Sequence, residues 1–127
     1  MKNFEELLQS ADWKSEKHVP VIEIVEKGET VKLNVSVGKE IPHPNKTEHH
    51  IRWIEIYFLP EESKFPYMIG KADFTSHGAS TEGPDTSTVY TEPTATFSFK
   101  TEKSGILYAF SYCNIHGLWV NSEELNL

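Results

Sequence analysis

Cysteine occurs only once in the 127 residues of this chain, at position 113. A single cysteine excludes an internal disulfide and agrees with a reducing compartment. The chain also lacks any apolar run long enough to span a membrane. Its first residues, MKNFEELLQSADWK, lack the uninterrupted apolar core of a secretion signal. We therefore expect a cytoplasmic protein.

Positive charge is scarce as well. The chain has 12 Lys and Arg residues against 19 Asp and Glu, which gives a formal net charge of -7. We do not expect such a chain to bind nucleic acid, and an anionic substrate would need local positive charge at its site. Hydrophobic residues make up 38% and charged residues 24% of the sequence, as in globular proteins. The length predicts one domain over residues 1–127 with one hydrophobic core.

Helix is nearly absent from the predicted structure, apart from a short helix or loop at residues 3–9. Most of the chain alternates apolar and polar residues, most clearly at 30–38, where Val31, Leu33 and Val35 share one face. Strands are expected at 19–25, 30–38, 50–59, 67–74, 95–100, 105–113 and 117–125. Seven strands separated by frequent turns predict an all-β, immunoglobulin-like antiparallel sandwich, with a small barrel as the alternative. The Ser/Thr/Gly/Pro-rich segment 76–94 is expected to be a long loop.

Four of the six histidines fall at predicted strand edges or in turns, and one of them lies three residues after the only cysteine. These residues are His18, His43, His49 and His116, with Cys113. Taken singly, a histidine or a cysteine of this kind is usually structural. Together, a C-x-x-H turn and an H-P-x-x-x-x-H loop are harder to explain that way, because loops at one end of a sandwich converge in space. We predict a metal site built from these five side chains.

The composition of this set limits the choice of metal. Four imidazoles and one thiolate exceed the four ligands of structural zinc. Blue copper sites take two histidines, one cysteine and a later methionine, whereas the only methionines here are Met1 and Met68. Iron with five protein ligands and one open position fits best. Two alternatives remain at this point: an iron or copper electron-transfer module with a closed site, and a metal-free immunoglobulin-like interaction domain.

Three segments carry a resemblance to a known family. EKHVP (16–20), HPNKTEHH (43–50) and CNIHGLW (113–119) resemble the iron-binding signatures of the superoxide reductases, in the neelaredoxin or one-iron branch of the desulfoferrodoxin family. The resemblance implies a seven-stranded immunoglobulin-like sandwich. It also implies an oxidoreductase that reduces superoxide to hydrogen peroxide at one mononuclear non-haem iron, cycling between Fe²⁺ and Fe³⁺. Because no O₂ is released, the reaction suits defence against oxidative stress in an oxygen-sensitive cell.

The resemblance also implies a role for each residue of the site. The equatorial ligands would be His18, His43, His49 and His116, with Cys113 as the axial thiolate. Glu16 would be a sixth ligand in the ferric state, and Lys17 would lie beside the open position and attract superoxide. His50 and His77 match no ligand of the family.

Partners are implied in the same way. The two-iron branch carries an additional four-cysteine iron domain, and this chain has no such cysteines. Electrons would then come from a separate, rubredoxin-like donor. One-iron members of the family are often homotetramers, and we carry that over as an expectation.

Two details of the Cys113–Gly117 turn are our own hypotheses. Backbone N–H groups near Ile115 and His116 would hydrogen-bond the cysteine sulfur and moderate its electron donation. Gly117 would allow the tight backbone of such a turn. Trp53 and Trp119 are expected to be core residues without a chemical role.

Overall fold

The computed structural model describes all residues, 1–127, and contains seven strands and one very short helix. The strands are β1 (Pro20–Glu26), β2 (Val31–Val37), β3 (Ile51–Pro60), β4 (Tyr67–Asp73), β5 (Thr94–Phe99), β6 (Gly105–Cys113) and β7 (Gly117–Leu125). They form two antiparallel sheets, one of order β1-β2-β5 and one of order β4-β3-β6-β7. Because the two sheets are not joined by hydrogen bonds at their edges, the fold is the predicted sandwich and not a barrel.

The core lies between the two sheets and is built by the alternation seen in the sequence. In β2 every second residue is buried, from Val31 to Val37. On the facing sheet, Ile54 and Ile56 of β3 and Leu107 of β6 are fully buried. Burying aliphatic side chains of this size contributes about 1.5–3 kcal/mol each, relative to leaving them exposed. This core fixes the register of both sheets and therefore the positions of the loops at their ends.

The N-terminal helix is shorter than the predicted range of 3–9. Helix α1 spans Phe4–Leu7 and buries none of its residues, so no packing supports a longer helix. Gln9 instead leaves the helix and pairs with the edge of β7, where its N–H donates to the Leu118 carbonyl and its own carbonyl accepts from Val120. The N-terminal segment is thereby attached to the last strand.

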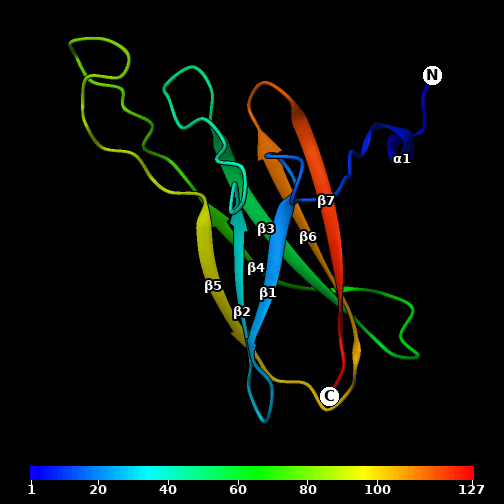
Figure 1. Ribbon diagram of the computed structural model, residues 1–127. Helices are drawn as coiled ribbons and strands as arrows, with labels where there is room; N and C mark the ends of the chain where they lie inside the picture. Colours follow the sequence, from blue (N-terminus) through cyan, green and yellow to red (C-terminus); the bar gives the residue numbers. More distant parts are fainter.

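Three connections lie at the same end of the sandwich, as Figure 1 shows. They are the β2–β3 loop, the long segment between β4 and β5, and the β6–β7 turn. The segment that leads into β1 reaches the same end. The predicted long loop is confirmed, and it carries small bridges of its own, between His77 and Tyr90 and between Ser80 and Gly83. Most of the predicted site residues lie in these connections.

Candidate metal centre

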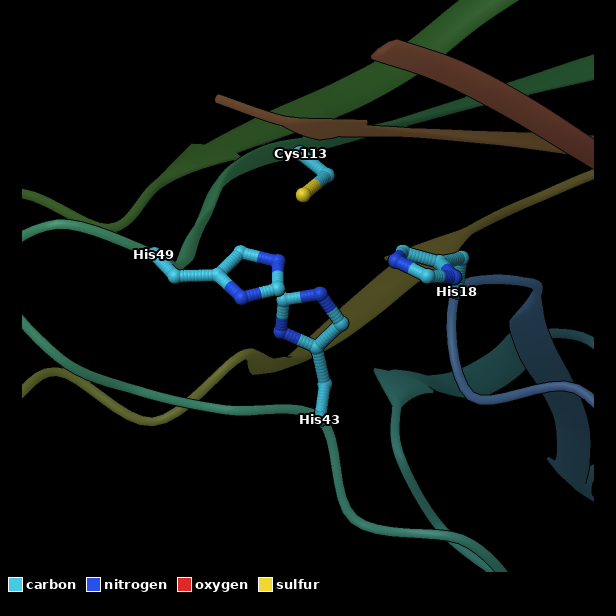
Figure 2. A group of neighbouring side chains, drawn as sticks. All are labelled: His18, His43, His49 and Cys113. Atoms are coloured by element: carbon cyan, nitrogen blue, oxygen red, sulfur yellow. The ribbon is translucent and has the colours of Figure 1, made fainter. Parts of the chain in front are cut away.

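Four of the predicted ligands form one compact group at this end of the molecule. His18 lies just before β1, His43 and His49 lie in the β2–β3 loop, and Cys113 is the last residue of β6. One ligand atom from each lies within 4.8 Å of all the others. The four side chains point toward a common centre (Figure 2). Ligand atoms from three distant parts of the chain thus lie close together around one point.

His116, the fifth predicted ligand, lies directly beside this group in the β6–β7 turn. Its Nδ1 is 3.1 Å from His18 Nε2 and 3.8 Å from the Cys113 sulfur. Its ring centroid is 5.0 Å from that of His49. Unlike the other four, His116 is exposed to solvent. The structure therefore brings all five predicted side chains together, with His116 at the outer edge.

Two of the ring nitrogens that face the centre, on His43 and His49, lack other partners, whereas His18 Nε2 lies 3.1 Å from His116 Nδ1. His18 Nδ1 bonds to Glu16 and His43 Nδ1 donates to the Pro44 carbonyl at 2.7 Å, which leaves Nε2 of both rings for the centre. The Nε2 atoms of His43 and His49 are buried without a hydrogen bond. A buried polar atom left unpaired costs about 1–3 kcal/mol. A metal ion at the centre would pair both atoms, so the donor set fits a bound metal.

Burial above all favours the neutral form of the His43 and His49 imidazoles, which is the form that binds metal. The pKa of His43 is lowered to about 4, mainly by burial and also by Lys17 and the neighbouring His18 and His49 rings, against the opposing effect of the hydrogen bond to Pro44. The pKa of His49 is lowered for the same reasons, by burial first and then by the charges of His116, His18 and Lys17. Lys17 acts on both rings, so its positive charge lies close enough to influence the site.

The cysteine sulfur is held by its own turn. Cys113 is fully buried, and the backbone N–H of His116 donates to its Sγ at 3.3 Å. This contact confirms the hypothesis of an N–H···S bond for His116. Gly117 closes the turn opposite Cys113 with φ +82°, a left-handed conformation that glycine adopts without strain. The turn thus orients both Cys113 and His116.

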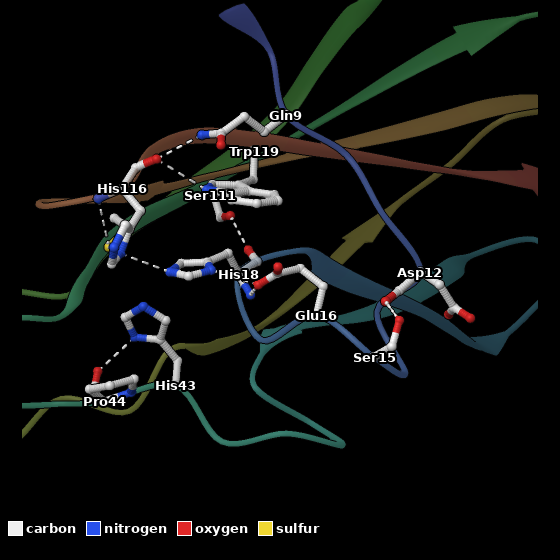
Figure 3. Close-up of polar contacts among 11 residues, drawn as sticks. Gln9, Asp12, Ser15, Glu16, His18, His43, Pro44, Ser111, His116 and Trp119 are labelled. Atoms are coloured by element: carbon white, nitrogen blue, oxygen red, sulfur yellow. Dashed lines mark hydrogen bonds and ion pairs between the residues drawn. The ribbon is translucent and has the colours of Figure 1, made fainter.

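Several contacts fix His18 and His116 from behind (Figure 3). The Trp119 indole stacks on the His18 ring, and Ser111 Oγ donates to the His18 carbonyl at 2.9 Å. The His116 carbonyl accepts from the Gln9 side chain at 2.7 Å and from Trp119 Nε1 at 3.3 Å. Trp119 is buried, as expected, but it also contacts a predicted ligand. Sequence reasoning did not predict the roles of Ser111 and Gln9, because no spacing in the sequence relates them to the histidines.

Glu16 lies outside the group of ligand atoms. Its Oε1 is 2.6 Å from His18 Nδ1 and accepts the His18 backbone N–H at 3.0 Å. Partial burial acts to raise the pKa of Glu16, but the hydrogen bonds from His18 outweigh it and lower the pKa. A carboxylate in this position orients the imidazole and increases its basicity as a ligand.

His50 and His77 also lie outside the group, and they stack on each other. Their ring centroids are 3.5 Å apart and their planes differ by 4°. His50 Nδ1 donates to the Lys46 carbonyl, while His77 bonds to Asn45 and to the Phe74 carbonyl. The pair connects the long β4–β5 segment to the β2–β3 loop that carries His43 and His49.

Comparisons with known proteins agree with this geometry. The desulfoferrodoxin family model matches residues 10–122. The chain is 64% identical over 120 residues to the superoxide reductase of Pyrococcus furiosus, covering 94% of this chain and 97% of that protein. It is 51% identical over 125 residues to the neelaredoxin of Megalodesulfovibrio gigas, covering 96% of each.

A solved structure with the same fold is the reduced superoxide reductase (neelaredoxin) of Archaeoglobus fulgidus. It has a TM-score of 0.93 and 66% identity, and the match covers 95% of this chain and 99% of that one. The fold and site described above define a β-sandwich protein with a group of histidine and cysteine side chains that could hold a metal ion. Within that class, the chain belongs to the desulfoferrodoxin family. No helix in the structure has the length and apolar character needed to cross a membrane.

Proposed function

We propose that this chain is a superoxide reductase, an oxidoreductase that combines superoxide with one electron and two protons to form hydrogen peroxide. The observation that carries the proposal is the inward-facing set of His43 and His49 Nε2 atoms, unpaired and buried beside the Cys113 sulfur. The names of the relatives, at 51–66% identity over nearly the whole chain, support the same activity.

The metal we propose is a single non-haem iron per chain. Its ligands would be Nε2 of His18, His43 and His49, Nδ1 of His116, and the Cys113 thiolate. Imidazole and thiolate together suit iron, and five protein ligands leave one coordination position for a small molecule. Bound iron supplies the electron that superoxide accepts.

Cys113 and its turn control how strongly sulfur donates charge to the centre. A bound metal would keep the cysteine deprotonated, and the thiolate would donate electron density to that metal. The His116 N–H bond to the sulfur withdraws part of that density. We infer that this balance favours release of peroxide over cleavage of its O–O bond.

Lys17 is proposed to attract superoxide to the open position. The chain carries a net charge of -7, so an anion approaches against the overall field. The positive charge of the half-buried residue Lys17 would offset that repulsion locally and could order a water molecule that delivers a proton.

Glu16 has two roles in the proposal. In the conformation described here it orients His18 through its Nδ1. To act as the sixth ligand in the ferric protein, it would have to give up this hydrogen bond and turn toward the metal. By moving between the two positions, the Glu16 carboxylate would occupy the sixth coordination position in the resting ferric protein and leave it free in the reduced protein.

The electron donor is proposed to be a separate, rubredoxin-like protein. With one cysteine, these 127 residues hold no four-cysteine iron site that could store an electron. We further propose that the protein acts in electron transport and oxidative-stress defence in the cytoplasm. We also propose that residues 1–127 form a single domain and that the chains assemble as a homotetramer. Native mass measurement tests the assembly, and metal analysis tests the count of one iron per chain.

The experiment that tests the function combines a spectrum with an assay. Iron-loaded protein should show a long-wavelength thiolate-to-iron absorption band when oxidised, and Cys113→Ser should lose it. The reduced protein should consume superoxide and form peroxide without releasing O₂, which separates a reductase from a dismutase. Bound iron without the band, or superoxide consumption with O₂ release, would refute the proposal.

A further inference from the structure

The side chain of Asn114 bridges the two loops that carry most of the predicted ligands. Its Oδ1 accepts the His50 backbone N–H at 2.9 Å, and its Nδ2 donates to the Glu48 carbonyl at 2.9 Å. Its backbone N–H donates to the His50 carbonyl at 3.2 Å. Asn114 therefore bonds to both neighbours of His49 and itself follows Cys113 directly.

The orientation of the Asn114 amide follows from its partners. One end of the amide faces an N–H group and the other faces a carbonyl. If the amide were reversed, neither contact could be a hydrogen bond. The amide oxygen would face the Glu48 carbonyl, which is also an acceptor, and the amide NH₂ would face the His50 N–H, which is also a donor. Only the observed orientation makes both hydrogen bonds, so this side chain satisfies two backbone groups where the β3–β6 pairing ends at Ile51 and Cys113.

His49 depends on this bridge more than the other imidazoles do. The ring of His18 is held by Glu16, and the ring of His43 by the Pro44 carbonyl. The His49 ring makes no hydrogen bond, and its Nε2 is unpaired. Its position is therefore set by its backbone, through the mutual Lys46–His49 hydrogen bonds on one side and through Asn114 on the other.

We propose that Asn114 is a positioning residue that fixes the His49 imidazole relative to the Cys113 sulfur. Asn114 would affect the reaction only through His49 and Cys113, because its own side chain bonds to backbone groups beside His49. This inference rests on the proposed iron site, because it assigns Asn114 the task that hydrogen-bonded outer partners perform for His18 and His43.

The test compares Asn114→Ala with Asn34→Ala in the iron-loaded protein. Asn34, in the middle of β2, also accepts one side-chain hydrogen bond, from Thr96, but does not lie in the loops that carry the ligands. Two properties are measured in the oxidised protein: the position of the thiolate-to-iron band and the rate of iron loss to a chelator. We expect Asn114→Ala to shift the band and to accelerate iron loss by about 10–100-fold, the usual effect of removing such a partner. Asn34→Ala should change neither.

Asn114→Asp provides a second, milder variant should the alanine protein fail to fold. Aspartate keeps an acceptor for the His50 N–H but cannot, as a carboxylate, donate to the Glu48 carbonyl. We expect a band shift in the same direction and a smaller increase in iron loss. A general loss of stability would change the melting temperature without moving the band.

The outcomes separate this inference from the proposed function. A wild-type band together with unchanged Asn114 variants would overturn the inference alone. Equal shifts in the Asn114 and Asn34 variants would also overturn it. Wild-type protein that holds iron without any band would overturn the proposed iron site, and the inference with it.

Discussion

The imidazole of His18 lies flat against the indole of Trp119, with ring centroids 4.9 Å apart and planes 10° apart. Trp119 is 8% exposed, and its Nε1 also donates to the His116 carbonyl. One aromatic side chain of β7 thus supports two of the predicted ligands, which lie on different loops.

Trp119→Ala should therefore damage both stability and the metal centre. Removing a buried tryptophan typically costs about 3–5 kcal/mol. In addition, His18 would lose the surface that holds its ring, so we expect weaker iron binding in the protein that still folds. Chemical denaturation measures the first effect and iron titration the second.

Trp53→Ala is the matched control for this change. Trp53 is only half-buried and is not the core residue that was predicted; its ring stacks on Tyr112 and on none of the predicted ligands. It should lose stability while retaining iron affinity. Equal loss of iron affinity in both variants would contradict a specific role for Trp119.

His49→Leu should separate stability from metal binding. In the metal-free protein, the Nε2 of His49 is buried without a partner, and the ring makes no hydrogen bond that the substitution could break. We expect the free energy of unfolding of the metal-free variant to equal or exceed that of the wild type, with a gain on the order of 1 kcal/mol. Added metal should raise the melting temperature of the wild type far more than that of the variant.

His77→Leu gives the opposite pattern and serves as the control. His77 makes two hydrogen bonds, to Asn45 and to the Phe74 carbonyl, and lies outside the ligand group. Its loss should lower stability and leave the stabilisation by metal intact. If His49→Leu behaved like His77→Leu, the predicted role of the unpaired nitrogen would be wrong.

Lys17→Ala should slow the capture of superoxide without releasing iron. Local charge at a cleft can raise the rate of association by about 10–10³-fold, and a single lysine contributes a part of that factor. We expect a reduction of about several-fold at low ionic strength that disappears at high salt. The second-order rate constant is measured by rapid mixing or pulse radiolysis over a range of salt.

Lys32→Ala removes the same charge from an exposed position on β2, beside Glu26. This variant controls for net charge, because it should leave the rate nearly unchanged. A similar slowing in both variants would mean that the overall charge, and not the place of Lys17, controls the approach of superoxide.

Asp85 should make the long β4–β5 segment sensitive to acid. The hydrogen bond from the Thr47 backbone N–H outweighs slight burial and, with those from Tyr90 and the Thr47 hydroxyl, lowers the pKa of Asp85 below its ordinary value of 3.8. A carboxylate with a lowered pKa stabilises the folded protein above pH 3.8, and this contribution is lost as the pH falls through the lowered pKa.

The comparison of wild type with Asp85→Asn tests this point. Asparagine tolerates the positive φ of 56° at this position and keeps an acceptor, but does not titrate. The difference in melting temperature between the two proteins should be constant near neutral pH and should shrink below pH 3.8. A difference independent of pH would rule out titration of Asp85 as the cause.

Strand positions were largely predictable because burial in a sandwich imposes a period of two. The expected ranges 105–113 and 117–125 coincide with β6 and β7, and the others differ by about one residue at either end. The helix prediction at 3–9 was too long, because its pattern did not reveal that Gln9 pairs with the edge of β7. The family and the enzyme class, predicted from three short segments, are confirmed by the comparisons.

The support around the site was not predictable from the sequence. Ser111 bonds to the carbonyl of His18, which is 93 positions away, and Trp119 meets the same histidine across the sandwich. Such contacts depend on strand register and sheet stacking, which local periodicity does not specify. The bond between Glu16 and His18 spans only two residues. The family resemblance implied instead that Glu16 is a sixth ligand of the ferric metal, a role that this hydrogen bond does not test.

The distance in sequence between His18 and His116, 98 positions, also determines when the centre can form. A ribosome releases the first of these residues early in synthesis and the last only when the final hairpin emerges. Until then, no partly made chain can gather all five side chains. If the site binds iron as proposed, only the folded molecule that contains both His18 and His116 offers all five ligands.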